Sequence, residues 1–158
     1  AYENPENVLV LETTKGRVVI RLRPDLAPNH VARIKELARE NFYDGVVFHR
    51  VIDGFMAQTG DPTGTGAGGS DKPDLKAEFT SEPHKRGTVS AARTAAPNSA
   101  NSQFFICFDE APWLNKQYSV FGEVIEGMEN VDKIKKGEPV RDPDSITTMR
   151  VATDIGAE

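Results

Sequence analysis

The chain has 158 residues, 38% of them hydrophobic and 27% charged, which is typical of a soluble globular protein and sufficient for one domain over residues 1–158. The net charge of −5, without a dense block of Lys and Arg, argues against nucleic acid or an anionic membrane as the main partner. No stretch approaches the ~20 apolar residues of a membrane span, and the acidic N-terminus lacks signal-peptide character. We therefore expect a cytoplasmic monomer.

The first part of the chain predicts a hairpin followed by a helix. Val8–Thr13 and Gly16–Leu22 have strand-like patterns, and the residues between them suit a tight turn. Pro28 suits the first turn of a helix, where its missing N–H has no partner to lose. Apolar residues then recur at helical spacing for about three turns, at Val31, Ile34, Leu37 and Ala38.

The rest of the chain predicts mainly strands. The candidates are Val46–Val51, Phe55–Thr59, Thr88–Ala92, Phe104–Phe108, Val120–Val124 and Thr147–Ala152. Glu129–Lys136 predicts a second short helix, with Val131 and Ile134 facing inward and Gly137 as its stop. Many short strands with two separated helices do not fit an alternating parallel sheet, so we expect a mainly β fold, a closed antiparallel barrel with helices over its ends.

The single cysteine excludes an internal disulfide. Cys107 lies in the apolar run Phe104–Phe108, so we expect it to be a small buried hydrophobe with a reduced thiol.

Two short segments combine polar side chains with aromatic residues inside strand-like sequence. The first is Phe48–Gln58, which contains Arg50, and the second is Ser102–Cys107, followed by Trp113–Leu114. One guanidinium and two amides among phenylalanines indicate a pocket that is half apolar and half polar. From composition alone, Arg50 could also be an arginine whose stem lies on the barrel while its charged head reaches water.

These segments closely resemble the signature of the cyclophilins, the cyclosporin-binding peptidyl-prolyl cis–trans isomerases. Phe48–Ile52 with Gly54–Met56 and Gln58 is similar to the family's first catalytic segment, and Ser102–Ile106 is similar to the second. The resemblance covers roughly Val8–Ala152. It implies an eight-stranded barrel capped by two helices, and an enzyme that accelerates rotation about X–Pro bonds and assists protein folding.

The resemblance also implies roles for individual residues. Arg50, Phe55 and Gln58 match the catalytic positions. The positions that match substrate-binding residues are Met56, Ala92, Arg93, Gln103, Phe105, Trp113, Leu114 and Tyr118. Without the motif, the apolar residues among them could equally be core, and the amides could be edge-strand groups that pair with the backbone.

Proline-containing peptides and folding proteins are the partners that the resemblance implies, with cyclosporin A as an inhibitor because Trp113 matches the family's groove tryptophan. Rotation breaks no bond, so neither a cofactor nor a metal is expected. Tyr118 stands where many cyclophilins have histidine, and Ala92–Thr94 also departs from the eukaryotic pattern. Both departures resemble the bacterial branch and concern peptide preference at the groove edges.

Three other kinds of site fit the sequence less well. The glycines of Gly60–Gly69 are similar to a phosphate loop, but the turn sequence Ser70–Pro73 follows them where a helix would be needed. The three histidines, His30, His49 and His84, fit no zinc spacing. Spacing leaves a hydrolase that uses His49 open, although no nucleophile elbow supports it.

The main alternative is a proline-motif binding module or holdase that does not turn over its ligand. It would use the same apolar slot, but it would gain little from a buried cation. Arg50 therefore separates the two hypotheses.

Overall fold

The first two strands form a hairpin whose two-residue turn is Thr14 and Lys15, as predicted. The structure, a computed structural model, describes residues 4–155. In this range the eight strands are β1 (Val8–Thr13), β2 (Gly16–Leu22), β3 (Arg50–Ile52), β4 (Met56–Thr59), β5 (Thr88–Ala91), β6 (Phe104–Cys107), β7 (Val120–Glu126) and β8 (Ile146–Val151). All except β3 lie close to the predicted ranges.

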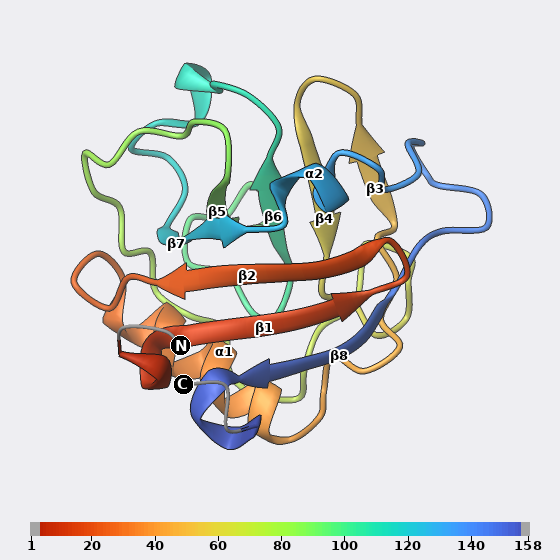
Figure 1. Ribbon diagram of the computed structural model, residues 1–158. Helices are drawn as coiled ribbons and strands as arrows, with labels where there is room; N and C mark the ends of the chain where they lie inside the picture. The colour runs from red at the N-terminus through yellow and green to blue at the C-terminus, as the bar shows by residue number, and fades with distance from the viewer. Residues whose placement is uncertain (1–3, 156–158) are drawn as a thin grey trace.

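The strands form one antiparallel sheet in the order β3-β4-β6-β5-β7-β2-β1-β8 (Figure 1). The prediction of an eight-stranded antiparallel sheet with two helices is confirmed, but "closed" overstates it. Within the described residues no strand ladder joins the edge strands β3 and β8, so the sheet is a curled half-barrel.

Isolated backbone contacts bridge the seam between the two edges. The Phe48 N–H donates to the Asp144 carbonyl at 2.9 Å, and the Ile146 N–H donates to the Val46 carbonyl at 2.8 Å. The predicted strand Val46–Val51 is therefore wrong at its start, because this segment makes isolated bridges and the ladder to β4 begins only at Arg50.

The helix α1 (Pro28–Arg39) begins at the predicted proline and packs against β7 and β8. Its apolar face, which includes Ile34 and Leu37, contributes to the main core. Arg39 in its last turn pairs with Glu6 and Asp154, which ties the two ends of the described chain to the helix.

The helix α2 (Met128–Val131) is much shorter than the predicted Glu129–Lys136. After Val131 the chain tightens, because the N–H groups of Lys133 and Ile134 donate to the carbonyls three residues back, at Asn130 and Val131, and not to those four residues back. The Lys135 N–H donates to Asp144 Oδ2 at 2.8 Å instead of to a helical carbonyl, and the same carboxylate accepts from Thr14 Oγ1. Val131 and Ile134 are nevertheless buried, as predicted, but Gly137 lies beyond the end of the helix.

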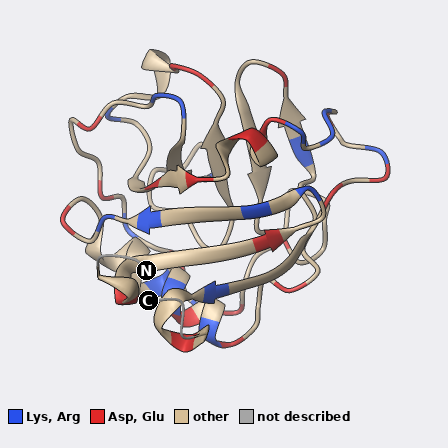
Figure 2. Ribbon diagram, in the orientation of Figure 1, with Lys and Arg blue, Asp and Glu red and all other residues tan. Residues whose placement is uncertain are grey.

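Three short 3-10 helices complete the described elements, η1 (Pro5–Asn7), η2 (Pro112–Leu114) and η3 (Ala152–Ile155). Charged residues of both signs alternate over the face of the molecule drawn in Figure 2. No helix of the described chain is both long enough and apolar enough to cross a bilayer.

Strand alternation sorts the side chains of β4 and β6 onto two faces of the sheet. Ala57, Phe104 and Ile106 point into the main core. The opposite face carries a second apolar cluster, made of Met56, Phe105, Cys107, Ala111 and Leu114. Cys107 is 0% exposed, and burial raises the pKa of its thiol to about 12. The prediction that Cys107 is a buried hydrophobe is confirmed.

Candidate active site

The register of three strands places the predicted site residues in rows on the outer face of the sheet. Arg50 of β3 lies opposite Gln58 of β4, and Gln58 lies opposite Phe105 of β6. In the next row Ile52 lies opposite Met56. Cross-strand neighbours on one face have Cβ atoms about 5 Å apart, so the two motifs, far apart in the sequence, form one continuous surface.

A hollow of about 110 Å³ lies on this surface. Its lining consists of Arg50, Phe55, Met56, Gln58, Ala92, Arg93, Phe105, Leu114 and Tyr118. The lining combines apolar side chains with two guanidinium groups and one amide, so the sequence indicated correctly that the pocket joins apolar and polar groups. All of the predicted residues except Gln103 and Trp113 therefore meet in one place.

A chain of side-chain amides leads away from Arg50. Arg50 Nη1 donates to Gln58 Oε1 at 3.4 Å, and Gln58 Nε2 donates to Gln103 Oε1 at 2.9 Å. Gln103 Nε2 then donates to the carbonyls of Gly66 and Gly68 at 3.0 and 2.9 Å. A guanidinium can only donate and a carbonyl can only accept, so the two ends fix the orientation of both amides.

The guanidinium lies at the rim of the hollow rather than in the core. The Arg50 side chain is 43% exposed, so the buried cation considered from the sequence is wrong for the free protein. Arg50 Nε donates to Glu138 Oε2 at 3.0 Å. Glu138 was not predicted, because no local motif marks a residue that reaches the site from a distant loop.

Trp113 of η2 stands beside the hollow without lining it. Its side chain is largely exposed, with 59% of the residue accessible, and its ring centroid lies 5.5 Å from that of Phe55. The indole thus extends the apolar wall outward from the hollow, at the groove edge where the resemblance expects it.

Arg93 and Ala92 occupy the opposite wall. The Arg93 guanidinium carbon lies 4.6 Å from the ring centroid of Tyr118, and Arg93 also donates to the Gln117 carbonyl. The N–H of Ala92 is already donated to the Gln103 carbonyl at 3.0 Å. The Ala92 amide is therefore used within the fold, and the Arg93 head is held by the wall.

His84 supports this pocket from behind and was not predicted to do so. Its ring stacks on Phe105 with centroids 6.2 Å apart, and its Nε2 lies 3.0 Å from Ser90 Oγ. Burial lowers the pKa of His84. The histidine comes from the loop before β5, and only the folded sheet shows that it touches the pocket wall.

His49 is buried on the other face of β3 from Arg50. Burial lowers its pKa, and neither ring nitrogen hydrogen-bonds to another group in the described chain. No hydroxyl or thiol of residues 4–155 is thus held by His49 as a nucleophile. The geometry favours a structural role and does not support a hydrolase.

A second, larger hollow of about 470 Å³ adjoins the first and shares Gln58, Ala92 and Arg93 with it. One wall is the glycine-rich loop, which Asp61 holds in place. The Asp61 carboxylate accepts hydrogen bonds from the backbone of Thr63, Gly66 and Gly68. Burial alone would raise the pKa of Asp61, but these bonds outweigh it and hold the pKa well below the usual range.

Comparison with known proteins shows the family to which the chain belongs. The family model for cyclophilin-type peptidyl-prolyl cis–trans isomerases matches residues 8–153. The chain belongs to this family. It is accordingly a cyclophilin, and its activity is peptidyl-prolyl cis–trans isomerisation.

Curated peptidyl-prolyl cis–trans isomerases of two bacteria are similar along most of the chain. A probable peptidyl-prolyl cis–trans isomerase of Brucella suis is 53% identical over 167 aligned positions, which cover 96% of this chain and 85% of the relative. A peptidyl-prolyl cis–trans isomerase of Helicobacter pylori is 43% identical and covers 81% of this chain and 80% of its own.

Solved cyclophilin structures have the same fold. Cyclophilin AquaCyp293 from Hirschia baltica superimposes with a TM-score of 0.89 at 33% identity, over 96% of this chain and 76% of its own. A Cryptosporidium parvum cyclophilin, crystallised in the presence of the dipeptide Ala-Pro, gives a TM-score of 0.85 at 28% identity, over 91% of this chain and 98% of its own.

Proposed function

We propose that the isomerase activity resides in the 110 Å³ hollow, with Arg50 as the group that lowers the rotation barrier. The observation that carries this proposal is the position of the guanidinium. It stands at the rim of the hollow, opposite apolar side chains, and is held at two of its nitrogens by Gln58 and Glu138.

The physics of the X–Pro bond explains why such a site is sufficient. Resonance opposes rotation with a barrier of ~18–20 kcal/mol, although the isomers differ by no more than about 1 kcal/mol. In the twisted transition state the proline nitrogen becomes pyramidal and regains its lone pair. A donor aimed at that nitrogen stabilises the twisted state and not the planar ones, which is the condition for catalysis.

Arg50 can supply that donor. A guanidinium has five N–H bonds, and within the described chain only one at Nε and one at Nη1 are donated to other side chains. Three remain for the substrate, and the group stays charged at any relevant pH. Removing ~7 kcal/mol from the barrier would accelerate rotation about 10⁵-fold.

The apolar wall holds the proline ring against the guanidinium. Its members are Phe55, Met56, Phe105 and Leu114. A bound peptide would cover the 43% exposed side chain of Arg50 and remove water from it, so that its charge would be less screened in the transition state. Gln58 and Gln103, whose amides are already oriented, would bind the peptide backbone beside the proline.

The substrates we propose are proline-containing segments of unfolded and folding proteins, whose folding the enzyme would assist. An isomerase assay on a short Ala-Pro peptide tests this proposal, with exchange NMR as the measurement of the cis–trans rate. Accelerated exchange, with chemical-shift changes centred on Met56, Phe105 and Leu114, is the expected result. Binding at these residues without acceleration would favour the binding-module alternative.

We also propose that cyclosporin A inhibits the enzyme, because the exposed indole of Trp113 lies beside Phe55 at the edge of the hollow.

We propose that the protein is a monomer and that it works in the cytoplasm. The large apolar side chains exposed in the described chain lie on separate elements, at Phe79, Trp113, Ile125 and Ile155. Light scattering would test the monomer, and fractionation of the native host would test the location.

A further inference from the structure

The segment after α2 runs along the free edge of β3 and is hydrogen-bonded on both sides of Arg50. On one side Val51 and Gly137 exchange both backbone hydrogen bonds, at 2.9 and 2.8 Å. On the other side the Val140 N–H donates to the His49 carbonyl at 3.1 Å. These bonds hold the backbone of Glu138 beside Arg50.

Gly137 permits the tight turn that the segment itself makes at this point. A Cβ at this position would lie 2.8 Å from the Val140 Cα and 2.9 Å from the Pro139 carbonyl oxygen. Both neighbours are backbone atoms and cannot move aside cheaply. The path of the segment is therefore built into the fold, and it brings a carboxylate to the guanidinium from a point 88 residues away in the sequence.

Glu138 and Gln58 hold different parts of the same guanidinium. Glu138 Oε2 accepts from Nε at 3.0 Å and Gln58 Oε1 accepts from Nη1 at 3.4 Å. Two contacts at separate nitrogens fix both the plane of the group and its rotation within that plane. Within the described chain, no other side chain accepts from Nη2 or from the second N–H of Nη1.

We propose that Glu138 is a positioning residue for the isomerase reaction, acting through Arg50. This rests on the proposed role of Arg50. The side chains of Glu138 and Arg50 are 58% and 43% exposed, and such ion pairs contribute little to folding stability. Catalysis is more sensitive than folding stability to the loss of this ion pair, because a donor must be held in the productive geometry before it can act on the twisted proline nitrogen.

The Glu138 carboxylate also offsets part of the positive charge of the guanidinium. This effect by itself would weaken Arg50 as a donor. An exposed partner in contact with water reduces that charge only modestly. Arg50 without Glu138 would have its long flexible stem restrained only by the single 3.4 Å contact to Gln58. We therefore expect the loss of orientation to outweigh the gain in charge.

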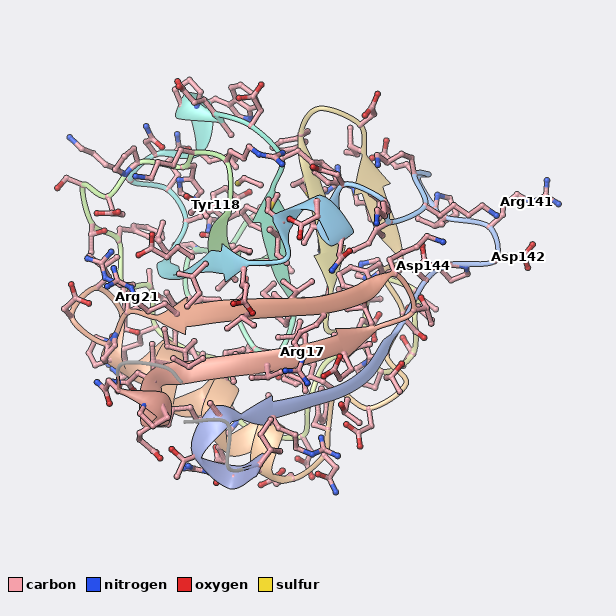
Figure 3. The ribbon with its side chains drawn as sticks, in the orientation of Figure 1. Arg17, Arg21, Tyr118, Arg141, Asp142 and Asp144 are labelled. Atoms are coloured by element: carbon pink, nitrogen blue, oxygen red, sulfur yellow. The ribbon has the colours of Figure 1, made fainter. Side chains whose placement is uncertain are left out.

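The test uses two substitutions at Glu138 and one matched control. Glu138→Gln removes the charge at nearly constant shape, and Glu138→Ala also removes the acceptor. Asp142→Asn is the control, because Asp142 lies in the same loop with its carboxylate directed away from the body of the protein (Figure 3). Asp142 has a positive φ of 50°, which asparagine tolerates.

The expected result is a loss of kcat/KM on an Ala-Pro peptide of about 2- to 5-fold for the Glu138 variants, larger for Glu138→Ala, on the scale of one exposed ion pair. Peptide affinity should stay within about twofold, because the apolar wall is intact. Asp142→Asn should match the parent protein. The NMR resonance of Arg50 Nε–Hε should move in the Glu138 variants and not in the control.

A double-mutant cycle decides whether Glu138 acts through Arg50. In an Arg50→Ala background, Glu138→Gln should cause no further loss. An equal loss in that background, or parent-like rates for both Glu138 variants, would overturn the proposal. If Arg50→Ala alone keeps the full rate, the proposed mechanism fails instead, so the two failures can be told apart.

Discussion

At the scale of single residues, the site depends on how Arg50 is held rather than on how deeply it lies. The guanidinium is partly exposed, yet Glu138 and Gln58 fix it from two sides. Gln58 in turn is fixed by Gln103. Preorganised donors of this kind act on the transition state without reorganising at the moment of reaction.

Arg50→Ala should therefore separate catalysis from binding. We expect cis–trans exchange on an Ala-Pro peptide to fall by ~10²–10³, the scale of losing one preorganised charged donor. Peptide affinity should fall only modestly because the apolar hollow remains. Exchange NMR measures the rate, calorimetry the affinity and circular dichroism the fold. Arg50→Lys should also be slow, because an ammonium lacks the planar fork that Gln58 and Glu138 hold.

Near-normal exchange in a folded Arg50→Ala protein would exclude the mechanism. Equal losses of rate and affinity would make Arg50 a uniform binding residue and favour the binding-module alternative.

Trp113→Phe should distinguish the drug from the substrate. The indole lies outside the hollow, beside Phe55, so we expect peptide turnover to change little. Cyclosporin binding should weaken much more, because phenylalanine has less surface and lacks the indole N–H donor. As the only tryptophan, Trp113 should report binding by its fluorescence. Unchanged fluorescence and full activity of the parent protein at high drug excess would contradict the prediction.

At the scale of elements, register and one glycine-rich loop build the site. The pairing of β3 with β4 and of β4 with β6 aligns Arg50, Gln58 and Phe105. The loop after β4 ends the amide chain, because its carbonyls at Gly66 and Gly68 accept from Gln103. The position of the amides thus depends on the conformation of this loop.

Asp61→Asn should disturb that loop and, through it, the site. Asp61 is 0% exposed and accepts several backbone N–H bonds, so an amide NH₂ placed among those donors would leave some unpaired. We expect the free energy of unfolding to fall by about 1–3 kcal/mol and the exchange rate to fall as well.

Urea unfolding and exchange NMR measure the two effects of Asp61→Asn. Asp71→Asn, an exposed position in the same loop region, is the control and should change neither. A stable Asp61→Asn protein with a parent-like rate would show that the loop does not depend on the carboxylate.

At the scale of the whole molecule, we expect the free energy of unfolding to fall in two stages as the pH is lowered. Burial lowers the pKa of His49 and His84, so the unfolded chain binds more protons than the folded one once the pH falls below about 6.5. The first loss of folding stability is therefore expected as the pH falls from about 7 to about 5, because the reference pKa of histidine in the unfolded chain is about 6.5.

The second stage comes from carboxylates whose pKa is lowered in the fold. Asp61 is held by loop hydrogen bonds, and Asp144 by the Lys135 N–H and Thr14. Their stabilisation is fully present above about pH 4 and is lost as they become protonated at lower pH. Urea unfolding from pH 3 to pH 8 checks both stages. Stability that stays constant or rises from pH 7 to 5 would contradict the histidine stage.

Local sequence patterns were sufficient for most of the elements and for most of the residues that line the hollow. Alternation in the second strand and helical spacing from Pro28 predicted β2 and α1 at their observed positions. The two motifs, Phe48–Gln58 and Ser102–Cys107, indicated a pocket that joins apolar and polar groups. These features are local, since each depends on residues a few positions apart whose faces follow from strand or helix periodicity.

The structural features that could not be predicted from the sequence depend on contacts between distant segments. The Asp144 carboxylate accepts from the Lys135 N–H beyond the end of α2, Glu138 reaches Arg50 from a point 88 residues away in the sequence, and His84 comes to lie behind Phe105. Each contact exists because the whole sheet curls and brings separate loops together. Periodicity records which face a residue occupies on its own element, but not which distant residue the folded chain places opposite it.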